Sequence, residues 1–155
     1  MSIEELYRSH GHVVLRRART LLGSEPDAQE ALQEIFAALL GNPAALRSTQ
    51  SVVGYLYQAT THHCLNQLRN RRNVVRLLER SGPADRLGGP AGEALTDLRR
   101  LLAQMPAEAA AAVVYHRVDG MTHDEVAGLL GCSRRQVGYL LERADLFLAR
   151  TEQIA

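Results

Sequence analysis

Hydrophobic residues recur every three or four positions along most of the chain, which is the spacing of one face of an α-helix. The clearest stretch lies between two breaks that contain proline, at Pro26 and Pro43. Its apolar positions follow helical spacing throughout: Ala28, Ala31, Leu32, Ile35, Phe36, Leu39 and Leu40. The pattern predicts an all-α protein.

Capping residues and helix breakers set the expected boundaries. Ser2 precedes Glu5 by three positions, the spacing of a capping box at a helix N-terminus. Glycine and proline stop the pattern after Leu22 and again at Gly41. We expect helices from Ser2 to about Leu22, from Pro26 to Gly41, from Val52 to about Leu78, over 93–105 and 106–118, and from Thr122 and Ser133.

A change of composition divides the chain. Six of the twelve residues 81–92 are glycine or proline, which is typical of a flexible linker. The sequence therefore predicts two small helical domains, over 1–80 and 93–155, joined by the 81–92 linker.

The composition of the 155 residues fits packed helices, because Trp is absent and only 5% are aromatic. The net charge is only +1, yet all 18 basic residues are arginine, a side chain suited to phosphates and base edges. Two distant cysteines argue against a disulfide framework. Neither a signal peptide nor a membrane span is recognisable, so we expect a cytoplasmic protein without membrane insertion.

The sharpest motif joins the last two expected helices. Thr122 and Ser133 are suited to cap them, and Gly131 between them supplies a left-handed turn. This arrangement predicts a helix-turn-helix whose second helix enters the major groove of DNA. Base edges are then within reach of Arg134, Arg135, Gln136 and Tyr139, and phosphates within reach of Ser133 and Arg143. An ordinary helical hairpin with solvated arginines is the alternative.

A basic region ends the first domain, since residues 62–80 hold five arginines and one glutamate. Upstream, aromatic, amide and basic side chains share one helix face: Tyr55, Gln58, His62, Asn66 and Arg69. Aromatic rings stack on unpaired bases and arginines bind the backbone, so this face suits a single strand. A solvated basic helix end is equally compatible with the sequence.

An acidic region begins the second helix, with a local charge of −4 over residues 24–36. Its polar side, opposite the apolar stripe, carries Gln29, Glu30, Gln33 and Glu34. A basic protein partner would fit this side, although acidic residues also stabilise a helix N-terminus by themselves. The +1 total therefore conceals +3 over 1–80 and −2 over 93–155.

The order of these parts resembles the sigma-70 family of RNA polymerase sigma factors, in its small extracytoplasmic-function class. Residues 27–36, DAQEALQEIF, are similar to the family's polymerase-docking helix. Residues 54–59 and 66–72 resemble the helix that melts and reads the minus-ten promoter element. Residues 102–106 and the helix-turn-helix resemble the region that reads the minus-thirty-five element.

The resemblance implies three sets of binding residues. Core polymerase binding falls to Asp27, Gln29, Glu30, Gln33, Glu34 and Phe36. Minus-ten DNA binding, including the single-stranded non-template strand, falls to Ser48, Tyr55, Gln58, His62, Asn66, Arg69, Arg71 and Arg72. Minus-thirty-five duplex binding falls to Thr122, Ser133, Arg134, Arg135, Gln136, Tyr139 and Arg143. The implied protein is a bacterial sigma factor, monomeric when free and nucleoid-associated on polymerase, with an anti-sigma factor as a further partner.

Two other functions remain open. A homodimeric helix-turn-helix regulator would bind a palindromic site, and a sigma-derived interaction module would bind polymerase or an anti-sigma factor without initiating. Gly138 and Leu140, where the family commonly has cations, keep the second alternative open. An enzyme is not indicated. His62, His63 and Cys64 are consecutive and diverge on a helix, so we expect no metal, no cofactor and no catalytic residue.

Overall fold

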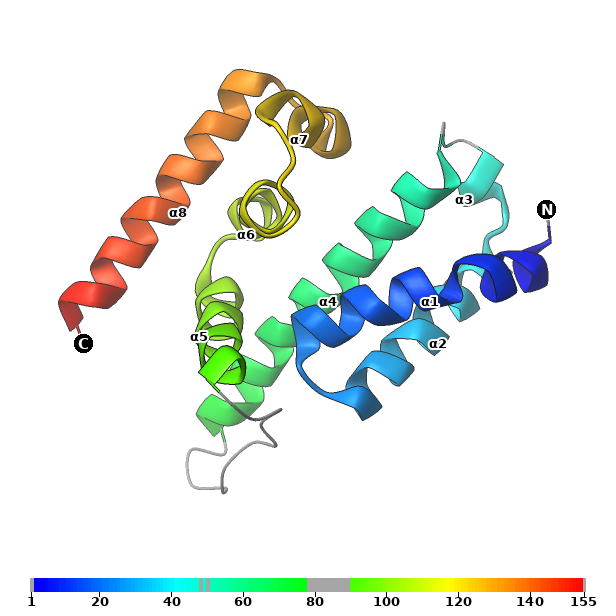
Figure 1. The fold of residues 1–155 in the computed structure, drawn as a ribbon, viewed down its shortest axis with the longest axis horizontal. Helices are drawn as coiled ribbons and strands as arrows, with labels where there is room; N and C mark the ends of the chain where they lie inside the picture. The colour runs from blue at the N-terminus through cyan, green and yellow to red at the C-terminus, as the bar shows by residue number, and fades with distance from the viewer. Residues whose placement is uncertain (1, 48, 50, 78–89, 155) are drawn as a thin grey trace. The chain divides into compact units, whose positions relative to one another are not determined.

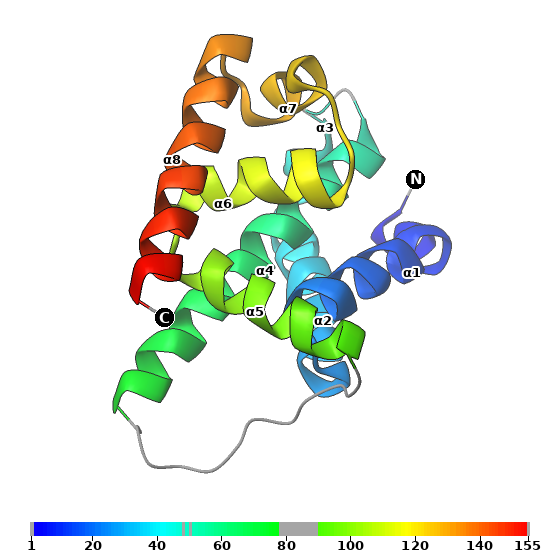
Figure 2. The ribbon, with the colours of Figure 1, turned by 60° about the vertical axis from the view of Figure 1, so that its left-hand side comes forward.

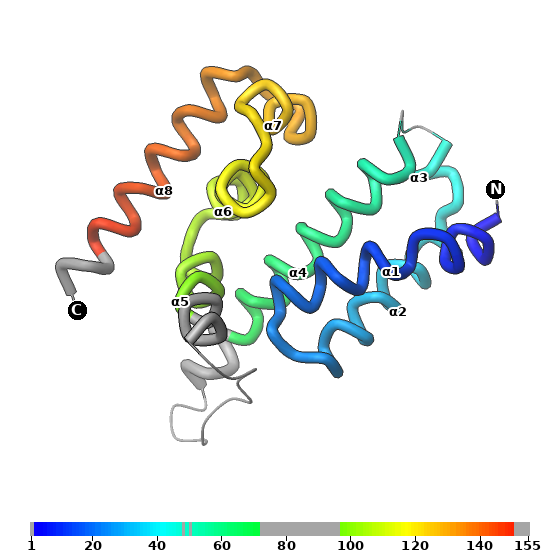
Figure 3. Tube along the Cα trace, viewed as in Figure 1, coloured from blue at the N-terminus to red at the C-terminus, as the bar shows by residue number. Residues whose placement is uncertain are grey.

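The computed structural model describes residues 2–47, 49, 51–77 and 90–154, without the side chains of 72–77, 90–96 and 151–154. The residues described in full are coloured in Figure 3. They form helices and no strand, which confirms the all-α prediction. The elements are α1 (Ile3–Leu22), α2 (Glu25–Gly41), α3 (Ala44–Arg47), α4 (Val52–Leu77), α5 (Pro90–Gln104), α6 (Ala107–Val113), η1 (Val114–Val118), α7 (His123–Leu130) and α8 (Arg134–Ile154).

Contacts divide the chain into two units, Met1–Arg100 and Leu101–Ala155. The predicted linker, 81–92, falls almost wholly outside the described residues, and α5 begins at Pro90 rather than at residue 93. Arg99, from α5, donates hydrogen bonds to the Thr20 carbonyl oxygen at 2.9 and 3.3 Å. The beginning of α5 is thereby counted with the first unit, whereas the sequence placed it in the second domain.

In the first unit, α1 packs against both α2 and α4, and α2 packs against α4 (Figure 1). The core takes the apolar stripe of each helix: Leu6, Val14, Leu32, Ile35, Phe36, Leu39 and Leu56. The Tyr7 ring meets the Phe36 ring edge-on, with 5.1 Å between centroids. Three helices with facing apolar stripes therefore suffice to bury this core.

The helix ends of the first unit follow the local sequence. Ser2 Oγ accepts from the Glu5 backbone N–H at 3.1 Å, and Glu5 Oε2 accepts in return from Ser2, so the predicted capping box is confirmed. Gly23 ends α1 with φ of 70°, and Ser24 caps α2. One element was not predicted: the four-residue helix α3 lies just before and within the stretch 46–51 that the sequence describes only as polar.

In the second unit, α6 and α7 both pack against α8 (Figure 2). Small residues make this packing close, because Ala109, Ala110, Ala111 and Ala112 of α6 are all buried. The expected helix 106–118 is present, but its last five residues form the π-helix η1. Its longer hydrogen bonds include Asp119 N–H to the Val114 carbonyl oxygen, at 2.9 Å. No local signal in the sequence distinguishes this turn from an α-helical one.

Candidate polymerase and nucleic-acid interfaces

The outer side of α2 carries the predicted acidic surface. Gln29, Glu30, Gln33 and Glu34 are all exposed, while the apolar stripe faces the core. This confirms the predicted sidedness of the helix. Phe36 differs, since its side chain is only 4% exposed and lies in the core against Tyr7. We therefore leave Phe36 out of the candidate surface, because a buried ring stabilises the helix position without contacting a partner.

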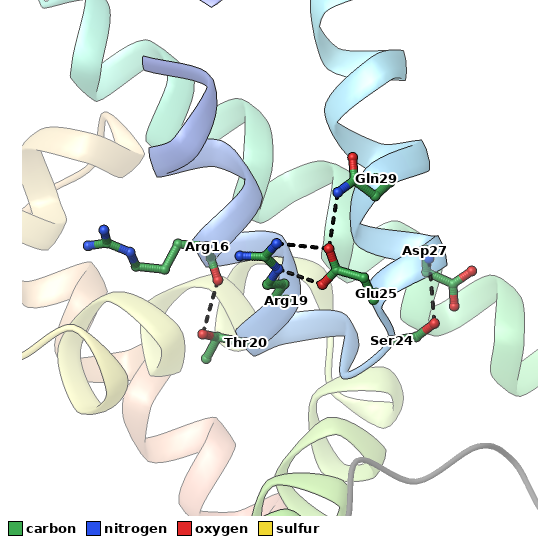
Figure 4. A network of polar contacts seen from close by, with 7 residues as sticks. All are labelled: Arg16, Arg19, Thr20, Ser24, Glu25, Asp27 and Gln29. Carbon is green, nitrogen blue, oxygen red and sulfur yellow. Dashed lines mark hydrogen bonds and ion pairs between the residues drawn. The ribbon is translucent and has the colours of Figure 1, made fainter. Parts of the chain in front are cut away.

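The first turn of α2 is held by a polar network that links it to the end of α1 (Figure 4). Arg19 donates to both carboxylate oxygens of Glu25, at 2.5 and 2.8 Å, and Gln29 donates to Glu25 at 3.0 Å. Hydrogen bonding by Arg19, and then by Gln29, lowers the pKa of Glu25 to about 2. Glu25 thus remains charged in the folded protein at acidities that neutralise ordinary carboxylates.

The Glu25 network predicts a defined acid sensitivity. The pKa of Glu25 is about 2 in the fold against an ordinary 4.5, so its contribution to stability is present above pH 4.5. That contribution is lost as the pH falls toward 2. Thermal unfolding of the wild type and of Glu25→Gln, measured from neutral to strongly acid pH, should show a difference in midpoint that shrinks across this window. A difference that stays constant with pH would contradict this assignment.

Asp27 and Arg71 pair with each other, although the sequence assigned them to different partners. The Arg71 guanidinium forms an ion pair with the Asp27 carboxylate and donates to the Leu22 carbonyl oxygen at 2.9 Å. Burial, and then the charge of Arg99, lowers the pKa of Arg71. The pair joins the start of α2 to α4 and satisfies a terminal carbonyl of α1. Both residues therefore have a structural role in addition to any role in binding.

The predicted strand-facing residues lie together on α4. His62 and Asn66 are exposed, and Tyr55, Gln58 and Arg69 are partly buried. Helical geometry places these five on the side away from buried Cys64 and Leu68. The Tyr55 ring also packs against the first-unit core. Ser48 and the Arg72 side chain lie outside the described residues, so their predicted roles stay predictions.

A contact between α1 and α4, missed by the sequence, supports this face. Arg17 places its guanidinium 3.8 Å from the centroid of the Tyr57 ring and donates to Thr61 Oγ1 at 2.7 Å. Thr61 Oγ1 donates in turn to the Tyr57 carbonyl oxygen at 2.8 Å. The contact fixes the turn of α4 that carries Gln58 and His62. It spans 44 positions of sequence, so no local pattern could have indicated it.

On the other side of α4, an open pocket of about 550 Å³ lies between α2 and α4. Its lining side chains are all polar: Asp27, Glu34, His63, Asn66, Gln67, Asn70 and Arg71. His63 Nε2 lies 3.0 Å from the Glu34 carboxylate across this pocket. The sequence gave no role to His63, Gln67 or Asn70. Their spacing, at i, i+4 and i+7 of one helix, is the signal that could have placed them on one face.

The helix-turn-helix has the predicted geometry. Thr122 forms a capping box with Glu125 at the start of α7, and Gly131 ends that helix with φ of 68°. Ser133 Oγ then accepts from the Gln136 backbone N–H at 3.1 Å, which caps α8. The two helices are held by buried Val126, Val137 and Leu140, whereas Leu130 is only partly buried. The turn therefore presents the N-terminus of α8 to solvent.

The predicted duplex-reading residues occupy the first three turns of α8. They are exposed in every case: Ser133, Arg134, Arg135, Gln136, Tyr139 and Arg143. Arg135 and Tyr139 share the face opposite buried Val137, while Arg134 lies toward Asp124 of α7, at 3.9 Å. Thr122 is exposed at the start of α7. Leu140 is 2% exposed, so its apolar side chain stabilises the motif rather than replacing a DNA-facing cation.

Two glycines of this motif predict opposite effects of the same substitution. Gly131→Ala forces a Cβ into the left-handed region at φ of 68° and should destabilise the second unit by about 1–2 kcal/mol. Gly128→Ala, inside α7 with open space around the new Cβ, should stabilise it by about 0.5–1 kcal/mol. Chemical denaturation of the two variants measures both signs, and equal effects would contradict the assigned turn.

Cysteine, histidine and membrane predictions have mixed outcomes. Cys64 and Cys132 are both free. Cys64 is buried as expected, and burial raises the pKa of its thiol to about 12, whereas Cys132 is only partly buried. Within the described residues, no group of three or more histidine, cysteine or acidic side chains is placed to hold a metal. No helix in the same residues is long and apolar enough to span a membrane.

Comparison with known families assigns both units. The family model for Sigma-70 region 2 matches residues 6–74, which contain the α2 surface, the α4 face and the pocket between them. The model for Sigma-70, region 4, matches residues 95–144, which contain the helix-turn-helix. The two matches follow the order that the sequence predicts.

Curated relatives and a solved structure agree with these matches. The sigma factor SigE of Mycolicibacterium smegmatis is 31% identical over 144 residues, which are 84% of this chain and 53% of SigE. SigM of Mycobacterium tuberculosis is 28% identical over 151 residues, 96% of this chain and 76% of SigM. Both relatives are described as ECF RNA polymerase sigma factors.

The fold is similar to that of the sigma factor RpoE from Bartonella quintana, solved in complex with the anti-sigma factor NepR. That likeness has a TM-score of 0.57 and 15% identity, and it covers 97% of this chain and 96% of RpoE. The chain spans about half the length of SigE, so an initiating activity does not follow from that match alone. Two family models, their order and the named relatives together show that this chain belongs to the sigma-70 family, in its extracytoplasmic-function class.

Proposed function

We propose that this chain binds core RNA polymerase and directs promoter-specific initiation, reading two promoter elements with its two units. The observation that carries the proposal is the exposed N-terminus of α8, where Arg135, Gln136 and Tyr139 follow a capped turn. A recognition helix presented in this way reads base edges in the major groove. We assign this unit to the minus-thirty-five element.

The first unit supplies the other two contacts of the proposal. The exposed acidic side of α2 suits a basic surface on polymerase, which would reach Glu30 and Glu34 directly. The α4 face offers Tyr55 for stacking and Arg69 for phosphates, and both features suit an unpaired non-template strand. Capturing unstacked bases would stabilise the melted minus-ten element without covalent chemistry.

The second unit is expected to depend on the first. Residues 93–155 carry a charge of −2, so nonspecific attraction to the phosphate backbone is weak in this part of the chain. Connection to a polymerase-bound first unit raises the effective concentration of the recognition helix at the promoter. We therefore propose that duplex reading is efficient only in the complex with polymerase.

The competing function, a homodimeric regulator, is separated by oligomeric state. We expect the free chain to elute as a monomer in size-exclusion chromatography and to elute with core polymerase when the two are mixed. A stable dimer that ignores polymerase and binds a palindromic duplex would overturn the proposal in favour of the regulator.

An anti-sigma factor is proposed as a second partner. The similar structure of RpoE was solved bound to such a factor, NepR. A partner of this kind would compete with polymerase for exposed surfaces of the chain. Addition of a candidate anti-sigma protein should then reduce the amount of chain that elutes with core polymerase.

A further inference from the structure

The pocket between α2 and α4 lies outside the surface that the sequence assigned to polymerase. Two positions of α2, Asp27 and Glu34, form one wall, and they are separated by two helical turns. The α4 wall is a stripe at helical spacing: His63, Asn66, Gln67, Asn70 and Arg71. The pocket is therefore an open polar groove that runs along both helices and adjoins the exposed side of α2.

One polar atom in this groove has no partner. Gln67 Oε1 is buried, and none of the described residues donates a hydrogen bond to it. A buried acceptor without a donor costs about 1–3 kcal/mol of stability. Such a cost is characteristic of side chains that meet their partner only on binding.

The charges of the groove favour a cation. Arg71 is already engaged by the Asp27 carboxylate and by the Leu22 carbonyl oxygen. The Glu34 side chain is half exposed, and its only printed neighbour in the groove is His63, at 3.0 Å. With His63 neutral, the lining side chains carry a formal charge of −1. Glu34 and Gln67 thus supply acceptors to a group that brings several donors.

We propose that this groove receives an arginine side chain from the polymerase subunit that docks on α2, a refinement that rests on the proposed function. The guanidinium would donate to Glu34 and to Gln67 Oε1 together. Arginine fits better than lysine because its planar fork presents five N–H donors at fixed angles and can reach two acceptors. Gln67, on α4, then becomes a polymerase-binding residue.

The substitution Gln67→Met tests this proposal because it keeps the length of the side chain and removes the acceptor. We expect the affinity of the full-length chain for core polymerase to fall about tenfold or more, as for the loss of a hydrogen bond to a charged group. The thermal midpoint of the free chain should stay equal or rise, since an unpaired buried acceptor disappears. A structural role for Gln67 would instead lower the midpoint. Gln104→Met, at an exposed glutamine of α5, is the matched control and should leave the affinity unchanged.

A double substitution tests whether Glu34 and Gln67 hold the same group. If one guanidinium bridges both side chains, Glu34→Gln combined with Gln67→Met should lose less affinity than the product of the single losses. Independent, multiplicative losses would overturn the shared arginine. Unchanged core affinity for Gln67→Met, with or without weaker binding of the melted strand, would also overturn it. In both cases the wild type still binds polymerase, whereas a wild type that fails to bind refutes the proposed function itself.

Discussion

Replacing Glu30 with arginine is expected to abolish practical binding to core polymerase. Glu30 is exposed on the outer side of α2, so the substitution leaves the helix packing in place. A new cation there would face the basic partner that the acidic surface is proposed to bind. Like charges brought together across an interface cost several kcal/mol, which corresponds to a loss of affinity of about a hundredfold or more. Fluorescence anisotropy with labelled chain and core polymerase measures this loss directly.

The matched control for this substitution is Glu108→Arg. Glu108 is an exposed acidic residue in the first turn of α6, in the second unit. The two variants have the same net charge, so a general electrostatic effect on polymerase binding would appear in both. Equal affinities for the two variants would remove the outer side of α2 from the polymerase interface.

Replacing Arg135 with alanine is expected to relax promoter specificity at one base position of the upstream element. Arg135 is exposed in the first turn of α8, next to the cap at Ser133. A bidentate arginine contact to a base is worth about 1–3 kcal/mol of discrimination. Transcription from a library of upstream-element variants, with reconstituted holoenzyme, should show this loss at one position and little change elsewhere.

Arg150→Ala serves as the control for the Arg135 experiment. Arg150 is exposed on the same helix, fifteen positions beyond Arg135, or about 22 Å along the axis. It should change neither affinity nor specificity. A loss for Arg135→Ala that is uniform across all sequences would make Arg135 a phosphate contact. No loss would take it out of the interface.

Features that depend on local sequence were predictable. The capping boxes at Ser2 and Thr122 and the left-handed turn at Gly131 involve residues within a few positions of each other, and each is present. The exposed side of α2 followed from its apolar stripe, because a stripe that enters the core leaves the opposite side to solvent. Local chemistry of this kind determines helix ends and helix faces.

Features that depend on how helices meet were not predictable. Asp27 and Arg71 are 44 positions apart, and only the packing of α2 against α4 brings them together. The resemblance placed Phe36 among polymerase-binding residues, yet its own place in the apolar stripe put it in the core. Gln67 gained a candidate role only when the pocket showed its buried oxygen. Spacing indicates which residues share a face of one helix, but not which face of another helix they meet.

The most direct test of the account is transcription by core polymerase reconstituted with this chain on a library of genomic fragments. The account predicts specific start sites that need the chain and that share two separated upstream elements. It predicts further that Glu30→Arg removes all of these starts, while Arg135→Ala alters only the choice of upstream element. Binding of the chain to core polymerase without any specific start would contradict the account and would favour an interaction module that no longer initiates transcription.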